Sequence, residues 1–398
     1  MNILHVIGSL DQRTGGPLRA VLNLSAASQA HGVSSEVLSV GEVRLSDNPL
    51  DPSLVHCIPL AIPNRYGYTP KLGRWLGANI GRFDCAILHG MWLFPGLATA
   101  RACWESGVPY AIFPHGMLEP WSVRGQGTWK YIKKVAYWTA IERAVFERAS
   151  CSLFTTRREM EQARNVFRFH WPARVVTPCG ITAPGPPGPE TGAIPQLEGH
   201  KFMLFLGRIH PCKNLPLLIR AWARAMAEKD WKLVIAGPSV RGHRWQVEKL
   251  AEELHVREQC IFLDFTSGPR KDWLLRAARW FALPSQHENF GVAMFEAVAH
   301  GCPVVVSDQV YSAEYLQPLG RILPLQEERW AEFFQTRLAD GDYRRQVIAS
   351  DAEAMHEYTM DKVAAKWATL LDGVFKKSSH LETVPDPNGT RIRTIRSD

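Results

Sequence analysis

The feature that most constrains the fold is a pattern that occurs twice, in which short apolar, β-branched runs alternate with stretches of helical composition. Continuous apolar runs of this length are typical of parallel strands that are covered by helices on both faces. In the first half, the expected strands are 3–10, 34–40, 54–60, 85–90, 110–116, 151–156 and 173–178. In the second half, they are 201–208, 232–238, 260–265, 280–285, 303–308 and 320–325. The pattern therefore predicts two doubly wound α/β domains in series.

The domain boundaries follow from where this pattern stops. Residues 183–199 (APGPPGPETGAIPQLEG) are too rich in Pro and Gly for a helix or a central strand, so we expect a linker there. An N-terminal domain is expected over 1–182 and a C-terminal domain over 200–360. Residues 361–377 are expected to form a helix that packs back towards the N-terminal domain, followed by a mobile tail over 378–398. Ligands are expected beyond the carboxyl ends of the strands, in a cleft between the two domains.

Composition argues against several classes of protein. The 46 Lys and Arg exceed the 39 Asp and Glu, which gives a formal net charge of +7 over 398 residues. This modest excess favours anionic small molecules or a lipid surface as partners, and no nucleic acid is expected. The eight cysteines form no C-x-x-C pair, which favours reduced thiols in a cytoplasmic protein. The first residues lack the charged front of a signal peptide, and no apolar run approaches the ~18 residues of a membrane-spanning helix.

One stretch, HENFGVAMFEAVAHGCPVVV at 287–306, places two glutamates eight positions apart. The composition predicts a loop with Glu288, a turn at Gly291 and a short helix with Glu296. Free N–H groups at a helix start favour a phosphate, and a carboxylate accepts paired hydrogen bonds from sugar or ribose hydroxyls. The element could therefore bind the parts of a nucleotide sugar. The alternative is two solvated glutamates, but Glu296 lies among apolar residues, where an unpaired charge is costly.

The same stretch resembles the E-x7-E signature of retaining glycosyltransferases of the GT-B fold, in particular glycosyltransferase family 4. The similarity extends from Met1 to about residue 375, with several separated motifs in the same order. It implies two Rossmann-like domains that face a cleft. It also implies a metal-independent, retaining hexosyltransferase that moves a sugar from a UDP- or GDP-sugar to a glycan or lipid-linked glycan, as in bacterial cell-surface polysaccharide synthesis.

The resemblance assigns roles to residues of the N-terminal half. TGGPLRAVLNLS resembles the family's glycine-rich loop, in which Gly15 and Gly16 let the backbone approach the donor diphosphate and the acceptor. FPHGMLEPW resembles its strand-end histidine segment, so His115 is expected to contact the donor sugar. ILHGMW places His89 at another strand end, as an acceptor-side candidate. The plainer alternatives are a tight turn before a helix and two structural histidines.

Further roles fall in the C-terminal half. FLGRIHPCKNL resembles the G-R-x-x-x-x-K-N segment, in which Arg208 and Lys213 hold a diphosphate whose charge grows as the glycosidic bond breaks. The resemblance implies that Glu288 holds sugar hydroxyls and that Glu296 holds the ribose. LDFTSG falls where the family contacts the base, which makes Phe265 a donor-binding candidate. Three residues are expected to lie against sugar and phosphate through their backbone: Asn289, Phe290 and Gly291. Both cations could instead be surface charges.

Two segments depart from the family pattern. TPCGI stands where the family often has P-N-G-I-D, so Cys179 and Thr182 replace Asn and Asp and leave the role of that loop open. The segment after VVVSD reads QVYSAEYL rather than a glycine-rich turn.

Because no convincing carboxylate nucleophile is present, the resemblance implies a front-face reaction in which the leaving phosphate accepts the proton of the acceptor. No cofactor and no metal are expected, and DGD at 340–342 is interpreted as a chance match to a metal-binding D-x-D.

The segment 127–149 interleaves Lys130, Lys133 and Lys134 with Trp and Tyr. This composition on one amphipathic helix suits an anionic membrane surface, so the protein could be peripheral at the inner face of the cytoplasmic membrane. An ordinary helix with inward aromatic residues is the alternative.

Two other functions stay open, a nucleotide-sugar epimerase and a catalytically silent sugar-nucleotide binding module. A nicotinamide dehydrogenase is disfavoured because no G-x-G-x-x-G follows the first strand.

Overall fold

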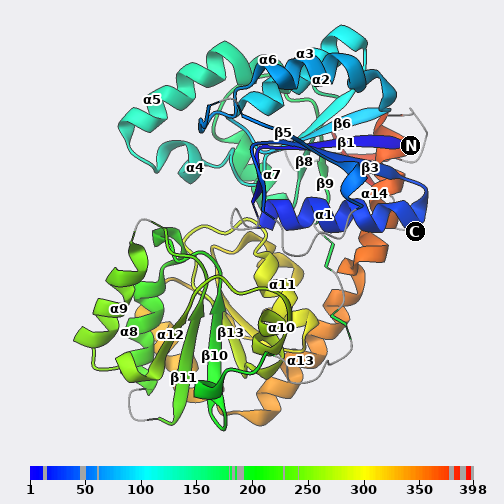
Figure 1. Cartoon of the computed structure of the whole chain (residues 1–398). Helices are drawn as coiled ribbons and strands as arrows, with labels where there is room; N and C mark the ends of the chain where they lie inside the picture. Colours follow the sequence, from blue (N-terminus) through cyan, green and yellow to red (C-terminus); the bar gives the residue numbers. More distant parts are fainter. Residues whose placement is uncertain are drawn as a thin grey trace. The chain divides into compact units, whose positions relative to one another are not determined.

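A parallel sheet lies at the centre of each half of the chain in the computed structural model (Figure 1). The chain divides into two compact units, residues 1–180 with 360–398 and residues 181–359. The two α/β domains predicted from the sequence are thus confirmed. Of the expected linker, the described part includes a 3₁₀ turn at Pro195–Leu197. The structure describes residues 1–11, 16–44, 51–60, 62–178, 180–181, 184–185, 192–226, 229–240, 242–375, 381–385 and 391–395.

The first unit contains a seven-stranded parallel sheet in the order β5-β3-β1-β6-β7-β8-β9. The order runs outward in one direction from β1 and in the other from β6, so the switch point of the sheet lies between these two strands. The strands are β1 (Asn2–Ile7), β3 (Ser34–Val40), β5 (Val55–Ile58), β6 (Cys85–His89), β7 (Tyr110–Phe113), β8 (Cys151–Phe154) and β9 (Ala173–Val176). A separate short pair joins β2 (Leu10–Asp11) and β4 (Val43–Arg44).

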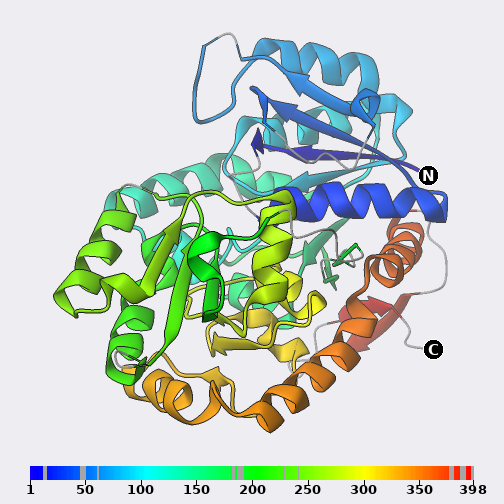
Figure 2. The same ribbon diagram turned by 60° about the horizontal axis from the view of Figure 1, so that its bottom comes forward.

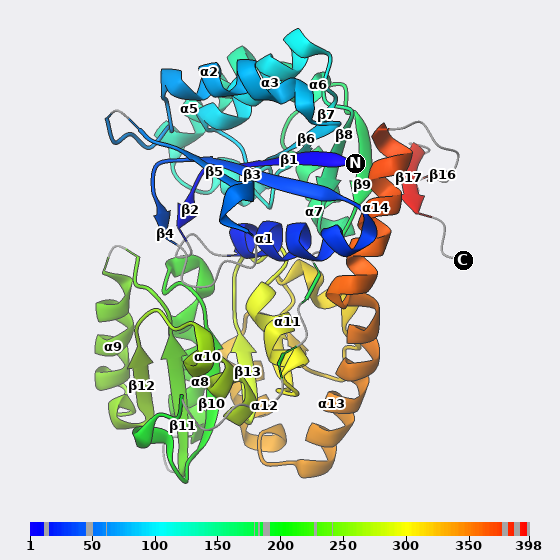
Figure 3. The same ribbon diagram turned by 45° about the vertical axis from the view of Figure 1, so that its right-hand side comes forward.

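The helices of the first unit cover both faces of this sheet (Figure 3). They are α1 (Gly16–Ser28), α2 (Pro70–Asn79), α3 (Phe94–Ser106), α4 (Pro120–Arg124), α5 (Thr128–Tyr137), α6 (Arg143–Glu147), α7 (Arg157–Arg164) and α14 (Met360–Phe375), with a π-helical turn at Trp138–Glu142 between α5 and α6. Successive strand residues point to opposite faces, so Leu4 and Val6 of β1 pack with α2 and α3. On the other face, Ile3 packs with α14 and Ile7 with α1.

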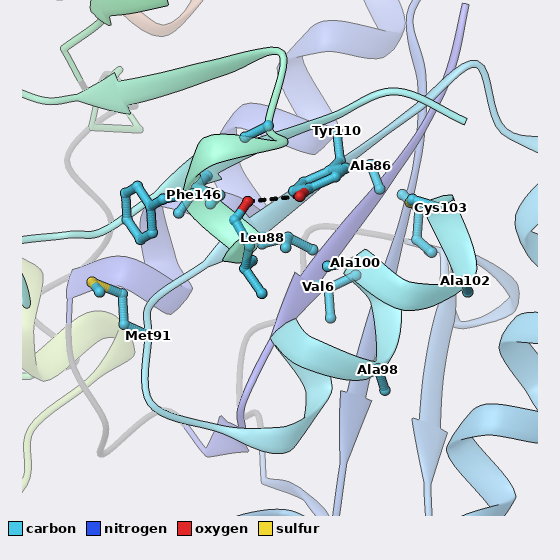
Figure 4. Close-up of a cluster of buried hydrophobic side chains, with 14 of the residues drawn as sticks. Val6, Ala86, Leu88, Met91, Ala98, Ala100, Ala102, Cys103, Tyr110 and Phe146 are labelled. Atoms are coloured by element: carbon cyan, nitrogen blue, oxygen red, sulfur yellow. Dashed lines mark hydrogen bonds between the residues drawn. The ribbon is translucent and has the colours of Figure 1, made fainter. Parts of the chain in front are cut away.

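Figure 4 shows part of the core between the sheet and α3 and α6. The buried ring of Tyr110 lies in it, and its hydroxyl donates a hydrogen bond of 2.6 Å to the backbone oxygen of Val145. The same hydroxyl accepts a 3.0 Å bond from the indole N–H of Trp104. The only polar atom of this large side chain is therefore satisfied, which is the condition for burying a tyrosine without a large cost.

The second unit repeats the architecture with six parallel strands in the order β12-β11-β10-β13-β14-β15. Its switch point lies between β10 and β13. The strands are β10 (Lys201–Leu206), β11 (Trp231–Ala236), β12 (Cys260–Leu263), β13 (Trp280–Leu283), β14 (Val304–Ser307) and β15 (Ile322–Leu323). The helices are α8 (Leu215–Met226), α9 (His243–Glu253), α10 (Gly268–Ala277), α11 (Val292–Ala299), α12 (Glu327–Arg337) and α13 (Gly341–Met355).

Aromatic contacts fix the helices on opposite faces of this second sheet. The ring of Trp280 on β13 meets Phe333 of α12 at 5.3 Å between centroids, and Phe202 on β10 meets Trp273 of α10 at 6.1 Å. Met203, next to Phe202, is the register partner of Trp280. Because neighbours along a strand point to opposite faces, α12 and α10 cover different sides of the sheet.

The last described residues form an antiparallel pair, β16 (Leu381–Pro385) and β17 (Arg391–Ile395), beside α14 (Figure 2). The sequence predicted a mobile tail over 378–398, and the remainder of that range lies outside the described residues. Helix α14 belongs to the first unit, so the chain returns to that unit after completing the second.

Candidate active site

Three histidines lie in a row on one face of the first sheet. The register pairs Ile7 with His89 and His89 with Phe113, so these residues point to the same side of neighbouring strands. His5 lies two residues before Ile7, and His115 lies two residues after Phe113. The ring nitrogens are joined by hydrogen bonds of 2.9 Å between His5 Nδ1 and His89 Nε2, and of 2.9 Å between His89 Nδ1 and His115 Nε2. The row begins inside β1 and ends just beyond β7.

Burial keeps these three rings neutral. His5 is fully buried, His89 is buried and His115 is partly exposed. Loss of solvation lowers the pKa of His5 to about 4 and that of His115 to about 3. The pKa of His89 lies well below its usual value, first because of burial and then because of the neighbouring histidines. The row is therefore a set of hydrogen-bonding groups rather than a cationic patch.

The backbone at His115 is held in an unusual conformation. His115 has a φ of 51°, in the left-handed region that few residues other than Gly adopt, although His is among the more frequent of them. The next amide, of Gly116, donates a 2.7 Å hydrogen bond to the buried carboxylate of Glu159, which also accepts from the Thr155 N–H at 2.7 Å. Glu159 belongs to the first turn of α7, whose N-cap is Thr156. A capped helix start thus fixes the loop that carries His115.

A second buried carboxyl group lies near His89. The π-helical turn at Trp138–Glu142 carries Glu142, whose carboxylate accepts a 2.6 Å bond from the N–H of Trp92, itself at a φ of 70°. Burial raises the pKa of Glu142 to about 7, and the bond from Trp92 opposes this shift. Glu142, His89 and Gly8 line a cavity of about 20 Å³, which is large enough for one water molecule. Such π-helical turns occur frequently at functional sites.

Only part of the glycine-rich loop lies within the described residues. Gly16 is the first residue of α1 and follows the end of β1. The prediction for Gly15 lies outside the described residues, as do those for Cys179 and Thr182. Gly16 comes after β1 and His89 is the last residue of β6, on the two sides of the switch point where ligands of doubly wound sheets bind.

In the second unit, Arg208 follows β10 at the switch point. Its backbone position depends on Gly237, because a Cβ at residue 237 would lie 1.9 Å from the carbonyl oxygen of Gly207. The Gly207 N–H donates a 2.9 Å hydrogen bond to the oxygen of Ala236, the last residue of β11, and the Ile209 N–H donates one of 2.9 Å to the oxygen of Pro238, so the segment around Arg208 continues the sheet. Arg208 itself is exposed, and no ion pair to it is found within the described residues.

Lys213 and Glu288 form an ion pair at the carboxyl ends of β10 and β13. The Lys213 ammonium donates to Glu288 Oε2, and the two side chains are only 14% and 16% exposed. The Gln286 N–H donates a 2.8 Å bond to the Cys212 oxygen, which ties the two loops together. The structure thus brings together two residues that are 75 positions apart and that the resemblance assigned to diphosphate and sugar.

The turn between the two glutamates has the geometry that the sequence predicted. Gly291, at a φ of 67°, is the N-cap residue of α11, and a Cβ there would crowd Leu283 at 3.2 Å and Glu288 at 3.3 Å. Phe290 is buried and stacks on Phe295 at 4.7 Å between centroids. Its ring is therefore part of the core, and the contact of its backbone with sugar and phosphate stays a prediction. Asn289 lies in the same loop, between Glu288 and Phe290.

The segment that departs from the family pattern supports this loop. The Tyr311 N–H donates a 3.0 Å bond to the Glu288 oxygen, and the Glu288 N–H donates a 3.3 Å bond to the Gln309 oxygen. The Ser312 hydroxyl donates to the Phe290 oxygen. The segment 309–316 therefore braces the backbone on both sides of Asn289.

Glu296 is paired with a residue that sequence reasoning missed. Lys271 of α10 donates a 2.8 Å hydrogen bond to Glu296 Oε1 on α11, with both side chains less than one-fifth exposed. The unpaired charge that made Glu296 notable in the sequence is thus compensated by a cation from a neighbouring helix. Phe265, in the loop between β12 and α10, is 38% exposed, and its expected contact with a base stays a prediction.

The DGD tripeptide has a structural role. The Asp340 carboxylate caps α13, where it accepts a 2.9 Å bond from the Tyr343 N–H, and it lies 3.6 Å from Arg337. Asp342 pairs with Arg345 on the same helix. Both carboxylates are engaged at a helix start, which agrees with the interpretation of this tripeptide as a chance match.

The amphipathic segment predicted over 127–149 is α5, the π-helical turn and α6. Trp129 is 68% exposed and Ile132 is 51% exposed, so the expectation of inward aromatic residues fails for Trp129. Trp138, one helical segment later, is buried as that alternative requires. Within the part of the chain that the structure describes, no helix is both long enough and apolar enough to cross a bilayer.

Known proteins resemble both halves of the chain. The family model "Glycosyl transferase 4-like domain" matches residues 15–180, and "Glycosyl transferases group 1" matches residues 191–349. The Anabaena protein Alr3699/HepE, solved with UDP and glucose, matches 94% of this chain and 100% of its own with a TM-score of 0.73 and 16% identity. A likeness at this identity shows the fold, which confirms the GT-B prediction.

Curated relatives match parts or most of the sequence. An uncharacterized glycosyltransferase of Methanocaldococcus jannaschii is 30% identical over 171 residues, which are 42% of this chain and 43% of that protein. The Campylobacter jejuni N-acetylgalactosamine-N,N'-diacetylbacillosaminyl-diphospho-undecaprenol 4-alpha-N-acetylgalactosaminyltransferase is 36% identical over 29% of this chain and 30% of its own. The match thus spans less than half of either relative. The Mycobacterium leprae phosphatidyl-myo-inositol mannosyltransferase is 25% identical over 92% of this chain and 96% of its own. With both halves matched in order and the fold shared, the chain belongs to the group 1 glycosyltransferases of the GT-B fold, the family 4 type.

Proposed function

We propose that the protein is a retaining glycosyltransferase that uses a nucleotide sugar as donor, of the UDP- or GDP-sugar class. The observation that carries the proposal is the arrangement at the carboxyl edge of the second sheet. Two partly buried carboxylate–ammonium pairs, Lys213 with Glu288 and Lys271 with Glu296, flank a glycine turn and a helix N-terminus. A nucleotide sugar carries the complementary groups, because its diphosphate suits cations and its hydroxyls suit carboxylate oxygens.

The chemistry follows from how these pairs can rearrange. A bound diphosphate competes with Glu288 for the ammonium of Lys213, and Arg208 adds a second, exposed cation. Glu288 then has free oxygens for sugar hydroxyls, and the cations neutralise the charge that grows on the leaving phosphate. No metal is needed for that neutralisation. The leaving phosphate accepts the proton of the acceptor in a front-face reaction, and His115 contacts the donor sugar.

Donor binding is the first test. We expect a UDP- or GDP-sugar to raise the melting temperature of the protein, because a ligand that binds only the folded state stabilises it. Glu288→Gln and Lys213→Ala should each remove most turnover, by about a hundredfold or more, since each removes a contact at the reacting centre. Glu253→Gln is the matched control, because Glu253 forms an exposed ion pair with Lys249 at 3.7 Å. Near-wild-type rates in both site variants would falsify the assignment.

Product analysis separates the proposal from its alternatives. A transferase releases nucleotide only when an acceptor is present, and a retaining enzyme keeps the anomeric configuration of the donor. Conversion of the donor without an acceptor would identify an epimerase instead. Donor binding with no turnover against any glycan or lipid-linked glycan would identify a binding module.

The acceptor is proposed to be a glycan or lipid-linked glycan, used at the cytoplasmic membrane surface. Two relatives are named for polyprenyl-linked and phosphatidylinositol acceptors. On α5, Ile132 and Lys133 lie three and four positions after Trp129, so the three residues share one helix face. This face is exposed, and exposed Lys130 lies beside it. An apolar and basic face of this kind suits an anionic lipid surface.

Vesicle flotation tests the membrane part alone. We expect the protein to float with phosphatidylglycerol vesicles at low salt, and less so after the double change Trp129→Ser with Ile132→Ser. Trp245→Ser is the control, because Trp245 is 65% exposed on α9 of the second unit. No flotation, or equal loss in the control, would remove the membrane surface from the proposal.

A further inference from the structure

We propose that His5 and His89 are positioning residues that fix the tautomer of His115, so that His115 presents an N–H donor on Nδ1 to an oxygen of the ligand. The inference rests on the proposed function only for the statement that a ligand oxygen lies at His115. The tautomer itself is a property of the first unit and can be measured without substrate.

The direction of the hydrogen bonds along the row is determined at His5, its fully buried end. A neutral imidazole has one N–H and one bare nitrogen. His5 uses Nδ1 towards His89, while its buried Nε2 meets no hydrogen-bond partner within the described residues. A buried N–H without an acceptor is rarer in proteins than an under-used acceptor atom. The proton of His5 therefore lies on Nδ1, and His5 donates to His89.

The nitrogen that is protonated in one ring determines which nitrogen is protonated in the next. His89 Nε2 accepts from His5 and must be bare, so the proton of His89 lies on Nδ1. That proton is donated to Nε2 of His115, 2.9 Å away. His115 Nε2 is then bare as well, and its proton must lie on Nδ1. Because His115 is the partly exposed member of the row, Nδ1 is the atom through which it can serve a ligand.

The reverse order is disfavoured for a definite reason. A bare Nδ1 on His115 requires an N–H on Nε2 of each ring in turn. The last of these would be the buried Nε2 of His5, which has no acceptor within the described residues. The neutral state of the rings supports this coupling, because a protonated ring would carry an N–H at both positions and would break the alternation.

The inference defines what His115 can do. A donor on Nδ1 suits an acceptor oxygen, such as a sugar hydroxyl or a phosphoryl oxygen. It does not suit a general base, since the nitrogen that faces the ligand already carries a proton. His115 thus binds and orients, and removal of the proton from the acceptor is left to another group.

Nitrogen NMR of the full-length protein with ¹⁵N-labelled histidine tests the tautomers directly, because protonated and bare ring nitrogens resonate far apart. We expect His115, His89 and His5 all to be protonated on Nδ1 near neutral pH. His5→Asp replaces the donor with a carboxylate, which only accepts, so His89 and His115 should shift towards protonation on Nε2. His5→Asn places an amide N–H near the position of Nδ1 and should restore the wild-type pattern. Ile3→Val, on the same face of β1, is the control for packing and should change no tautomer.

The outcomes are distinct. A bare Nδ1 on wild-type His115 overturns the inference, and so does a His115 tautomer that is unchanged in His5→Asp. If the tautomer shifts, kcat should fall about tenfold in His5→Asp and recover in His5→Asn, as for the loss of one hydrogen bond. A tautomer shift with full turnover in both His5→Asp and His115→Ala would support the row but remove His115 from the proposed catalytic site.

Discussion

The row of three histidines predicts a steep loss of stability in acid. Their usual pKa of 6.5 applies in the unfolded chain, whereas the folded values are about 4 for His5 and about 3 for His115. Below pH 6.5 the unfolded chain therefore binds more protons than the folded one, and the free energy of unfolding falls as the pH falls. At 1.36 kcal/mol per pKa unit, each of these two groups costs about 3 kcal/mol by pH 4. Glu142 opposes one of these losses, since its pKa is raised to about 7.

The change His115→Asn isolates one of these contributions. Asparagine tolerates the left-handed φ of 51° at this position and does not titrate. We expect the wild type to lose about 3 kcal/mol more than this variant between about pH 7 and about pH 4, in urea unfolding followed by near-UV circular dichroism. His31→Gln, an exposed change in the turn after α1, is the control and should keep the wild-type dependence. Equal losses in the wild type and in His115→Asn would show that burial does not hold this imidazole neutral.

Three further changes test other parts of the structure. Gly237→Ala places a Cβ 1.9 Å from a carbonyl oxygen at a φ of 147°, and should lower the free energy of unfolding by at least ~3 kcal/mol. In the comparison variant Gly242→Ala, the new Cβ meets no atom within 4 Å, and urea unfolding measures the difference between the two. Asp351→Asn leaves the fully buried Arg321 without its charge partner, and should cost about 3–5 kcal/mol and lower the melting temperature in calorimetry by about 10 °C. Glu142→Gln removes a group whose raised pKa lowers stability as the pH rises from 4.5 to about 7, so the variant should gain about 3 kcal/mol over the wild type at about pH 8 relative to about pH 4.

The sheets could be predicted because both of their faces are buried. A strand such as Cys151–Phe154 is apolar at every position, and this leaves a continuous run in the sequence. The predicted ends of the strands were less accurate. The run at 3–10 ends in the structure at Ile7, and Leu10 instead pairs with Val43 in a separate short ladder. The last run, at 320–325, shortens to Ile322–Leu323 at the edge of its sheet.

The candidate site was predicted where a motif is continuous in the sequence and missed where it depends on packing. Glu288 and Gly291 lie in one short motif, but Lys271 reaches Glu296 only because α10 packs beside α11. The row of histidines depends on the register of β1, β6 and β7, which the sequence does not specify. A signal did exist for His5, since it is a polar residue inside the apolar run ILHVI and a buried polar group needs a partner.

Because the chain returns to its first unit at α14, that unit cannot complete its fold until the second unit has been synthesised. Val363, Trp367, Leu370 and Leu371 of α14 are buried against the first sheet, and each such side chain contributes roughly 1.5–3 kcal/mol. A ribosome must first translate residues 181–359, which are the whole second unit and at 5–20 residues per second take on the order of ten seconds or more. During that time one face of a seven-stranded sheet lacks its last helix. The unit that begins first is thus completed last, and a nascent chain of this protein needs protection of that face until its C-terminal helix leaves the exit tunnel.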